Sequence, residues 1–213
     1  MRRSFPRLIA YLAIFFGVLI GLARATAIRW YKIPTDDPYL QASIAPTLVG
    51  GDWILLWRLT KPGFGDLALC AEPNAEQRSV IGRIVGVGRD KVEIRGAELS
   101  VNNRRMSNEN ADSPTFTVTD PATKQEIEQP LDKEDLVGRV HLRGGIPKGR
   151  QREPVTLAAE PGSAVLVSDN RFLPYDSRDF GLVPLESCKE MVIYRIVGAK
   201  GFGDVATRLS WVW

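Results

Sequence analysis

Residues 80–95, Val-Ile-Gly-Arg-Ile-Val-Gly-Val-Gly-Arg-Asp-Lys-Val-Glu-Ile-Arg, carry the clearest signal of the fold. The first part, residues 80–87, is a largely apolar run of strand length. The last part, residues 91–95, alternates polar and apolar side chains with a period of two, which is typical of a half-buried strand. Gly88 and Asp90 mark a turn between the two parts. The stretch therefore predicts two consecutive β-strands.

Short segments of the same kind recur along the chain after residue 40, with Gly, Pro, Asn and Asp between them. No segment in this region shows a sustained helical period with capping residues. The pair Asn102-Asn103 is expected to form a hairpin turn. Further strands are expected at residues 53–57, 67–70, 99–101, 164–167 and 191–197. These features predict a mainly β domain, either an all-β sandwich or a barrel.

A change of composition divides this β domain. Residues 107–152 are rich in Asn, Asp, Glu, Lys and Pro, and only modest strand signals appear in them, at residues 116–118 and 137–142. We therefore expect an inserted β subdomain at residues 103–163, between two parts of a core at residues 31–102 and 164–213. Residues 1–30 form a separate N-terminal segment.

The N-terminal segment has the charge pattern of a membrane anchor. Arg2, Arg3 and Arg7 precede an apolar run at residues 8–23. A spanning helix needs about 20 residues, and arginines at its ends can extend their side chains to the interface. We expect one helix over about residues 6–28, anchored in the lipid bilayer. A cleaved secretory signal fits the same pattern and stays open as the alternative.

The orientation of the anchor follows from the leading arginines. Positive charges before an apolar segment favour an N-terminus in the cytoplasm. The β domain would then lie on the outer, periplasmic side of the cell (inner) membrane.

The composition of the 213 residues excludes several classes of function. There are 28 basic and 25 acidic residues, and the net charge of +3 is too small for a nucleic-acid-binding protein. One histidine, His141, and two cysteines, Cys70 and Cys188, cannot supply the four ligands of a Cys/His zinc site. We expect no metal and no cofactor. His141 is expected on the surface, whereas a Cys70–Cys188 disulfide and two separate thiols are both left open.

Three segments of the chain combine small, polar and charged residues in a fixed order. They are Ser43-Ile44-Ala45-Pro46-Thr47-Leu48 with Gly51-Asp52, then Gly82-Arg83 with Gly86 and Asp90, then Ser168-Asp169-Asn170-Arg171 with Asp176-Ser177-Arg178, Gly181 and Val183. Taken in this order, they resemble the motifs of the type I signal peptidase family. The third segment is the most specific, and the resemblance extends from residue 8 to about residue 200. The resemblance implies an all-β, membrane-anchored serine endopeptidase that removes signal peptides on the outer side of the membrane.

The resemblance places Ser43 at the position of the nucleophile, but the base is missing. In this family a desolvated lysine, which can lose its charge, takes the proton of the serine hydroxyl. Gly82 stands at the lysine position, and Pro174 stands where the family has a serine that hydrogen-bonds the lysine. Gln41 stands where the family often has a second oxyanion donor, so its amide either replaces that donor or lies on the surface.

The polar residues of the third segment are kept. In the family they form a buried scaffold behind the site, and such a scaffold maintains the fold with or without activity. The supporting residues of this scaffold are expected to be Asp169, Asn170, Arg171, Asp176, Ser177 and Arg178.

Three functions follow from these observations. The favoured one is a signal peptidase homologue that holds signal peptides or preproteins in an extended groove but is impaired or inactive as a protease. The second is a working signal peptidase that takes its base from elsewhere, such as His141. The third is a structural subunit of a membrane complex. The sequence does not set the oligomeric state.

Overall fold

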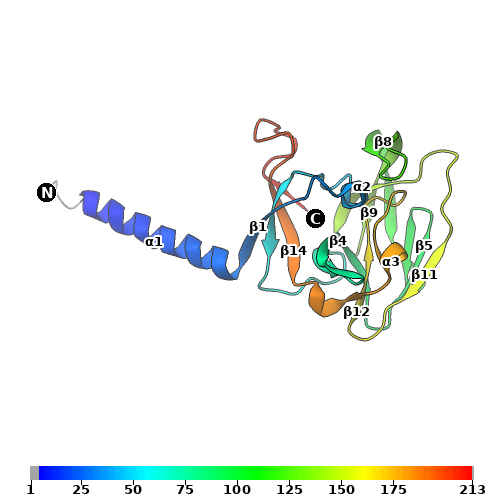
Figure 1. Cartoon of the computed structure of the whole chain (residues 1–213), viewed down its shortest axis with the longest axis horizontal. Coiled ribbons are helices and arrows are strands. Elements are labelled where there is room, and N and C mark those ends of the chain that lie inside the picture. Colours follow the sequence, from blue (N-terminus) through cyan, green and yellow to red (C-terminus); the bar gives the residue numbers. More distant parts are fainter. Residues whose placement is uncertain (1–4, 213) are drawn as a thin grey trace.

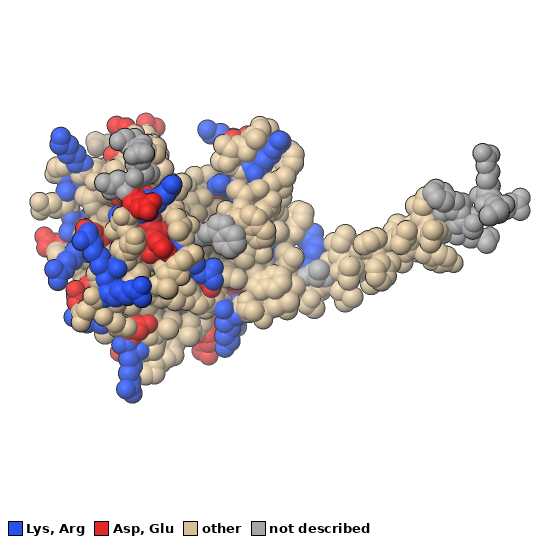
Figure 2. All heavy atoms as spheres, turned by 180° about the vertical axis from the view of Figure 1, so that it is seen from behind, with Lys and Arg blue, Asp and Glu red and all other residues tan. Residues whose placement is uncertain are grey.

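The computed structural model describes residues 5–212, in which a long N-terminal helix precedes a β domain. Helix α1 (Phe5–Thr26) extends away from the rest of the chain (Figure 1). Its part from Leu8 to Thr26 is long and apolar enough to cross a membrane, and none of it is buried against the β domain. Figure 2 shows most of the helix as an uncharged projection, in contrast to the charged surface of the β domain. The predicted N-terminal helix is confirmed.

The largest sheet is antiparallel and contains most of the predicted strands. Its strand order is β1-β2-β14-β3-β4-β12-β13, and β15 pairs with β14. The strands are β1 (Ile28–Lys32), β2 (Trp53–Trp57), β3 (Leu67–Glu72), β4 (Ala75–Val87), β12 (Ser163–Val167), β13 (Val183–Pro184), β14 (Glu190–Val197) and β15 (Ser210–Trp211). The mainly β fold class is confirmed.

Two smaller sheets complete the domain. One has the order β11-β5-β6-β7, and the other has the order β10-β9-β8. The predicted turn at Asn102-Asn103 joins β6 to β7, and both asparagines have a positive φ. The strands are β5 (Lys91–Arg95), β6 (Glu98–Val101), β7 (Arg104–Arg105), β8 (Ser107–Thr119), β9 (Glu126–Asp135), β10 (Val140–Gly144) and β11 (Val155–Ala158). The boundaries of the inserted subdomain stay a prediction.

Strand β4 is paired along only part of one of its edges. Strand β3 pairs with it from Ala75 to Arg83, whereas β12 pairs with it only from Arg83 to Val87. In the described part of the chain, no strand pairs with residues 77–82 of β4 on the edge away from β3. That edge therefore lacks a neighbouring strand over these residues, of which 77–79 are exposed or half-buried and 80–82 are buried.

Two short helices pack against this sheet. Helix α2 (Pro38–Ile44) contributes Leu40 and Ile44 to an apolar cluster that includes Ile81 of β4. Helix α3 (Ser177–Phe180) contributes Phe180 to a second cluster, which contains Val80, Ile84, Leu166 and other buried residues. Because successive side chains of a strand point to opposite faces, Ile81 and Val80 serve different clusters. A 3-10 turn, η1 (Leu185–Ser187), leads into β14.

A disulfide joins Cys70 of β3 to Cys188, just before β14. Both cysteines are buried in the cluster that also holds Val80 and Phe180. Of the two alternatives for these residues, the structure therefore contains the disulfide. Such a bond persists in oxidising compartments, which agrees with a β domain outside the cytoplasm.

Candidate functional site

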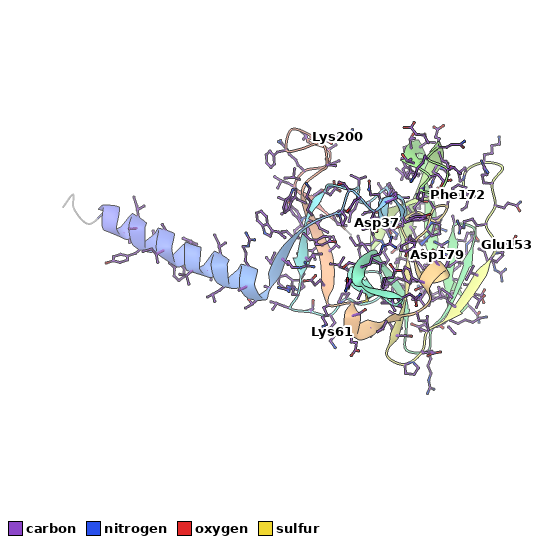
Figure 3. The ribbon with its side chains drawn as sticks, viewed as in Figure 1. Asp37, Lys61, Glu153, Phe172, Asp179 and Lys200 are labelled. Carbon is purple, nitrogen blue, oxygen red and sulfur yellow. A yellow bond between two sulfur atoms is a disulfide. The ribbon has the colours of Figure 1, made fainter. Side chains whose placement is uncertain are left out.

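Helix α2 fixes the position of Ser43. Asp37, labelled in Figure 3, caps the helix, because its Oδ1 accepts a hydrogen bond of 3.0 Å from the amide of Leu40. Pro38 follows at the first helical position, where its missing N–H costs nothing. Ser43 lies in the last turn and is fully buried. Its carbonyl accepts a hydrogen bond of 2.9 Å from the amide of Asn170. The serine is therefore held between the helix and the loop after β12.

The hydroxyl of Ser43 is bonded to the main chain. Its Oγ donates to the carbonyl oxygen of Leu40 at 2.9 Å. A peptide carbonyl cannot take up the proton at neutral pH, so this contact does not activate the serine. A nucleophile of this kind needs a neighbouring base within hydrogen-bond reach.

Gly82 lies on β4, opposite Ala68 of β3, and is buried. A Cβ atom at this position would lie 3.3 Å from Cβ of Leu166 and 3.5 Å from the carbonyl oxygen of Val167. The first distance is close for two carbon atoms. Any side chain at position 82 must therefore displace Leu166 slightly, and a lysine is no exception.

Arg83, the next residue of β4, is fully committed to the scaffold. Its Nε and Nη2 donate to Asp169 at 2.7 and 3.1 Å, and its Nη1 donates to the carbonyl of Gly65 at 3.1 Å. Thr47 donates its hydroxyl at 2.5 Å to Asp169 Oδ2, the oxygen that also accepts from Arg83 Nη2. Burial by itself raises the pKa of Asp169, but Arg83, His141 and these hydrogen bonds outweigh it and hold the pKa below its usual range. Asp169 is therefore an ionised anchor rather than a base.

The start of helix α3 forms the second part of the scaffold. Asp176 and Asp179 form a capping box, and Asp176 also forms an ion pair of 2.7 Å with Arg178. Ser177 accepts a hydrogen bond of 2.9 Å from the amide of Leu166 through its Oγ. Both Asp176 and Ser177 are buried. These contacts connect α3 to β12, directly beside Gly82.

The loop between β12 and α3 is held by its own polar residues. Asn170 Oδ1 accepts hydrogen bonds from the amides of Phe172 and Leu173 at 3.1 and 2.9 Å. Arg171 donates from Nη1 to the carbonyl of Ser168 at 3.0 Å, and its Nη2 pairs with Glu134. Pro174 follows in this loop, half-buried, without a hydroxyl or an amide hydrogen to offer.

His141 is buried, not on the surface as predicted; only 5% of it is exposed. It pairs with Glu134 across β10 and β9, and its Nε2 lies 3.3 Å from Glu134 Oε2 and 3.5 Å from Asp169 Oδ1. The prediction failed because β10 inverts the usual alternation: Val140 and Leu142 are exposed, whereas the polar His141 and Arg143 point inward. His141 thus contacts the carboxylates of Glu134 and Asp169, whereas the hydroxyl of Ser43 contacts the carbonyl of Leu40.

Glu134 is the centre of this buried cluster. Burial by itself raises the pKa of Glu134, but the charges of Arg171, His141 and Arg143 outweigh it and lower the pKa to about 2. Because the folded pKa is depressed, the stabilisation is present at neutral pH and is lost as the pH falls from about 4.5 towards 2. The shift corresponds to a stability on the order of 3 kcal/mol.

We expect Glu134→Gln to lower the thermal midpoint at pH 7, because Arg171 loses a buried charged partner. Between pH 5 and pH 2 its midpoint should fall less steeply than that of the wild type, because the titrating group is gone. Melting curves of the solubilised full-length protein, followed by circular dichroism, measure both effects. Glu98→Gln removes an exposed partner of Arg105 and is the matched control. Equal slopes in the wild type and Glu134→Gln would refute the assignment.

A cavity of about 510 Å³ lies beside the unpaired edge of β4. One wall is the segment before and at the start of α2, and the opposite wall is the first half of β4. The lining residues are Tyr31, Pro34, Asp36, Asp37, Pro38, Tyr39, Leu40, Gln77, Arg78 and Ser79. We call this cavity the β4 groove. Its lining on β4 ends at Ser79, three residues before Gly82, and its lining on α2 ends at Leu40, three residues before Ser43.

Gln41 points to a different side of α2. Its Nε2 donates to the carbonyl of Thr35 at 2.8 Å, and its side chain packs against Gly50. It also lines a second cavity, of about 400 Å³, between α2 and Phe116 of β8. In this arrangement the amide of Gln41 is committed to Thr35 rather than to a developing oxyanion.

Sequence reasoning missed several residues that shape this region, chief among them Asp37, Arg78 and Tyr175. Asp37 carried a readable signal, since Asp followed by Pro is a common start of a helix. Arg78 and Tyr175 carried none, because their partners lie far away in the sequence.

Comparison with known proteins agrees with this architecture. No curated protein matches the sequence. The sequence does match the family described as "Signal peptidase, peptidase S26" over residues 7–196, which covers helix α1, the Ser43 helix, the Gly82 strand and the polar scaffold. On the strength of that match, the chain belongs to the signal peptidase family, peptidase S26.

Proposed function

We propose that this chain is a membrane-anchored signal peptidase homologue that binds the signal peptides of exported proteins in the β4 groove and hydrolyses them poorly or not at all. The proposal of weak or absent hydrolysis rests on the surroundings of the Ser43 hydroxyl. This hydroxyl donates to the carbonyl of Leu40, and the position of the lysine base is Gly82, which has no side chain. A serine hydroxyl without a base is a weak nucleophile.

Peptide binding is supported by the unpaired edge of β4. An extended peptide can add to such an edge as a further strand, so that main-chain hydrogen bonds supply affinity and the pockets between them supply selectivity. The resemblance to the type I signal peptidases implies that such a peptide carries a small-x-small sequence.

The location follows from the anchor and the disulfide. Helix α1 would span the membrane with its N-terminus in the cytoplasm, because arginines precede it. The buried Cys70–Cys188 bond supports a β domain on the oxidising, outer side. On this arrangement the β4 groove faces the compartment in which signal peptides emerge.

Peptide binding in the β4 groove is tested by hydrogen exchange. The full-length protein in detergent is incubated with a synthetic signal-peptide segment that ends in a small-x-small sequence, and amide exchange is followed by mass spectrometry. We expect slower exchange at residues 77–82 and 37–43 and no change in β8, whose free edge is the internal control. Protection confined to β8, or none anywhere, would contradict peptide binding in the β4 groove.

A further inference from the structure

Arg78 of β4 reaches across the β4 groove to Asp37 on the opposite wall. Its Nε donates to Asp37 Oδ2 at 2.9 Å, and its Nη2 donates to Oδ1 and Oδ2 at 2.9 and 2.8 Å. This is the two-pronged arrangement in which arginine binds a carboxylate most strongly. The guanidinium thus ties the two walls of the groove together.

Two further contacts, both with Tyr175 in the loop between β12 and α3, fix the guanidinium of Arg78. Its Nη1 donates to the hydroxyl of Tyr175 at 2.7 Å, and that hydroxyl donates to Glu72 of β3 at 2.8 Å. The guanidinium also lies 4.5 Å from the centre of the Tyr175 ring. Burial and the hydrogen bond to Glu72 raise the pKa of Tyr175 to about 12, so its hydroxyl keeps its proton at neutral pH.

The Arg78–Asp37 ion pair also controls the orientation of helix α2, which carries Ser43. Asp37 uses Oδ1 both for Arg78 and for the cap of α2, through the amide of Leu40. Tyr39, in the first turn of α2, contacts Tyr175, with ring centres 5.8 Å apart and ring planes tilted by 45°. Arg78 and Tyr175 therefore set where α2 begins relative to β4.

We infer that Arg78 is a positioning residue for peptide binding, which sets the width of the β4 groove by holding Asp37 and the start of helix α2 at a fixed distance from β4. The inference rests on the proposed function, because it assumes that a peptide occupies this groove. Neighbouring strands lie about 4.7–4.9 Å apart, so a peptide strand beside β4 fits only within a narrow range of widths. Arg78 and Asp37 lie outside the motifs that define the family resemblance.

The test measures the affinity of full-length protein in detergent for a fluorescent small-x-small signal-peptide segment. We expect Arg78→Gln to weaken binding about tenfold, because the neutral amide cannot replace the charged fork. Arg78→Lys should restore part of the loss, since it keeps the charge but lacks the fork geometry. Asp37→Asn keeps a good helix cap, so it should weaken binding with little change in the thermal midpoint.

The double variant Asp37→Asn/Arg78→Gln should bind about as weakly as Arg78→Gln alone, because the two residues act through one contact. Arg105→Gln is the matched control: it breaks an ion pair with Glu98 on β6, in another sheet, and should leave the affinity unchanged. Wild-type affinity in Arg78→Gln, or additive losses in the double variant, would overturn the positioning role while leaving peptide binding intact. No binding by the wild type would overturn both proposals.

Discussion

Introducing a lysine at position 82 together with a serine at position 174 should create a peptidase activity, since the proposed function holds that the wild type lacks a base for Ser43. Burial among Val80, Ile84 and Leu166 would lower the pKa of the new amine towards the range in which it can act as a base. The Pro174→Ser hydroxyl would give that amine a hydrogen-bond partner. We expect no cleavage of a preprotein by the wild type, weak cleavage by Gly82→Lys and the fastest cleavage by Gly82→Lys/Pro174→Ser. The readout is the appearance of the mature protein on a gel, confirmed by mass spectrometry.

The same substitutions should cost stability, and the cost can be separated from the chemistry. A Cβ at position 82 approaches Leu166 at 3.3 Å, so we expect overpacking to cost about 1–3 kcal/mol. Gly82→Ala introduces the same Cβ without an amine. It should therefore lose stability as Gly82→Lys does, but gain no activity. The double variant should be more stable than Gly82→Lys alone, because the serine hydroxyl satisfies one donor of the buried amine.

Adding Ser43→Ala to the double variant should abolish the new activity, since Ser43 would be its nucleophile. Cleavage that survives Ser43→Ala would show that another residue attacks. Equal inactivity of the double variant and Gly82→Ala, in protein that still binds peptide, would mean that the amine does not reach Ser43.

Removing the disulfide should produce the largest loss of stability among the substitutions considered. Cys70 and Cys188 are 118 residues apart in the sequence, and chain-entropy arguments assign a crosslink of that span about 5 kcal/mol. We expect Cys70→Ala/Cys188→Ala to lower the urea midpoint strongly. Reduction of the wild type under denaturing conditions, followed by refolding in reductant, should reproduce the effect. A loss below about 1 kcal/mol would mean that the bond contributes little to the fold.

Much of the β core could be predicted from the sequence. The strands at residues 53–57, 80–87 and 91–95 carry their own apolar runs or alternation, and glycines and asparagines mark the turns between them. The N-terminal helix could be predicted as readily, because a long uncharged apolar run is typical of a membrane-spanning or signal-sequence helix. In these segments local pattern and tertiary packing demand the same structure, so the pattern alone was sufficient.

The buried cluster around Glu134 could not be predicted in the same way. Strand β10 presents His141 and Arg143 to the interior because acidic partners lie there. These partners are Glu134, Asp132 and Asp169. The inward side chains are polar and the outward ones apolar, so the alternation by itself predicts the opposite orientation. Only the pairing of β10 with β9 and the contact of Gly144 with Asn170 reveal the partners.

The β4 groove was hidden for a related reason. Arg78 and Asp37 are 41 residues apart, and Arg78 and Tyr175 are 97 apart. Contacts over such distances leave no local trace in a single sequence. The disulfide could not be predicted for the same reason, since the sequence gives neither the distance between the two cysteines nor the directions of their side chains.

The account as a whole is tested most directly by incubating the wild-type, full-length protein with a preprotein whose signal peptide ends in a small-x-small sequence. Binding and cleavage are measured on the same sample, by fluorescence anisotropy and by mass spectrometry, with Ser43→Ala in parallel. The account predicts that both proteins bind the preprotein and that neither releases the mature chain. Cleavage at a single site by the wild type, absent in Ser43→Ala, would contradict it and would show that Ser43 has a base other than a lysine at position 82.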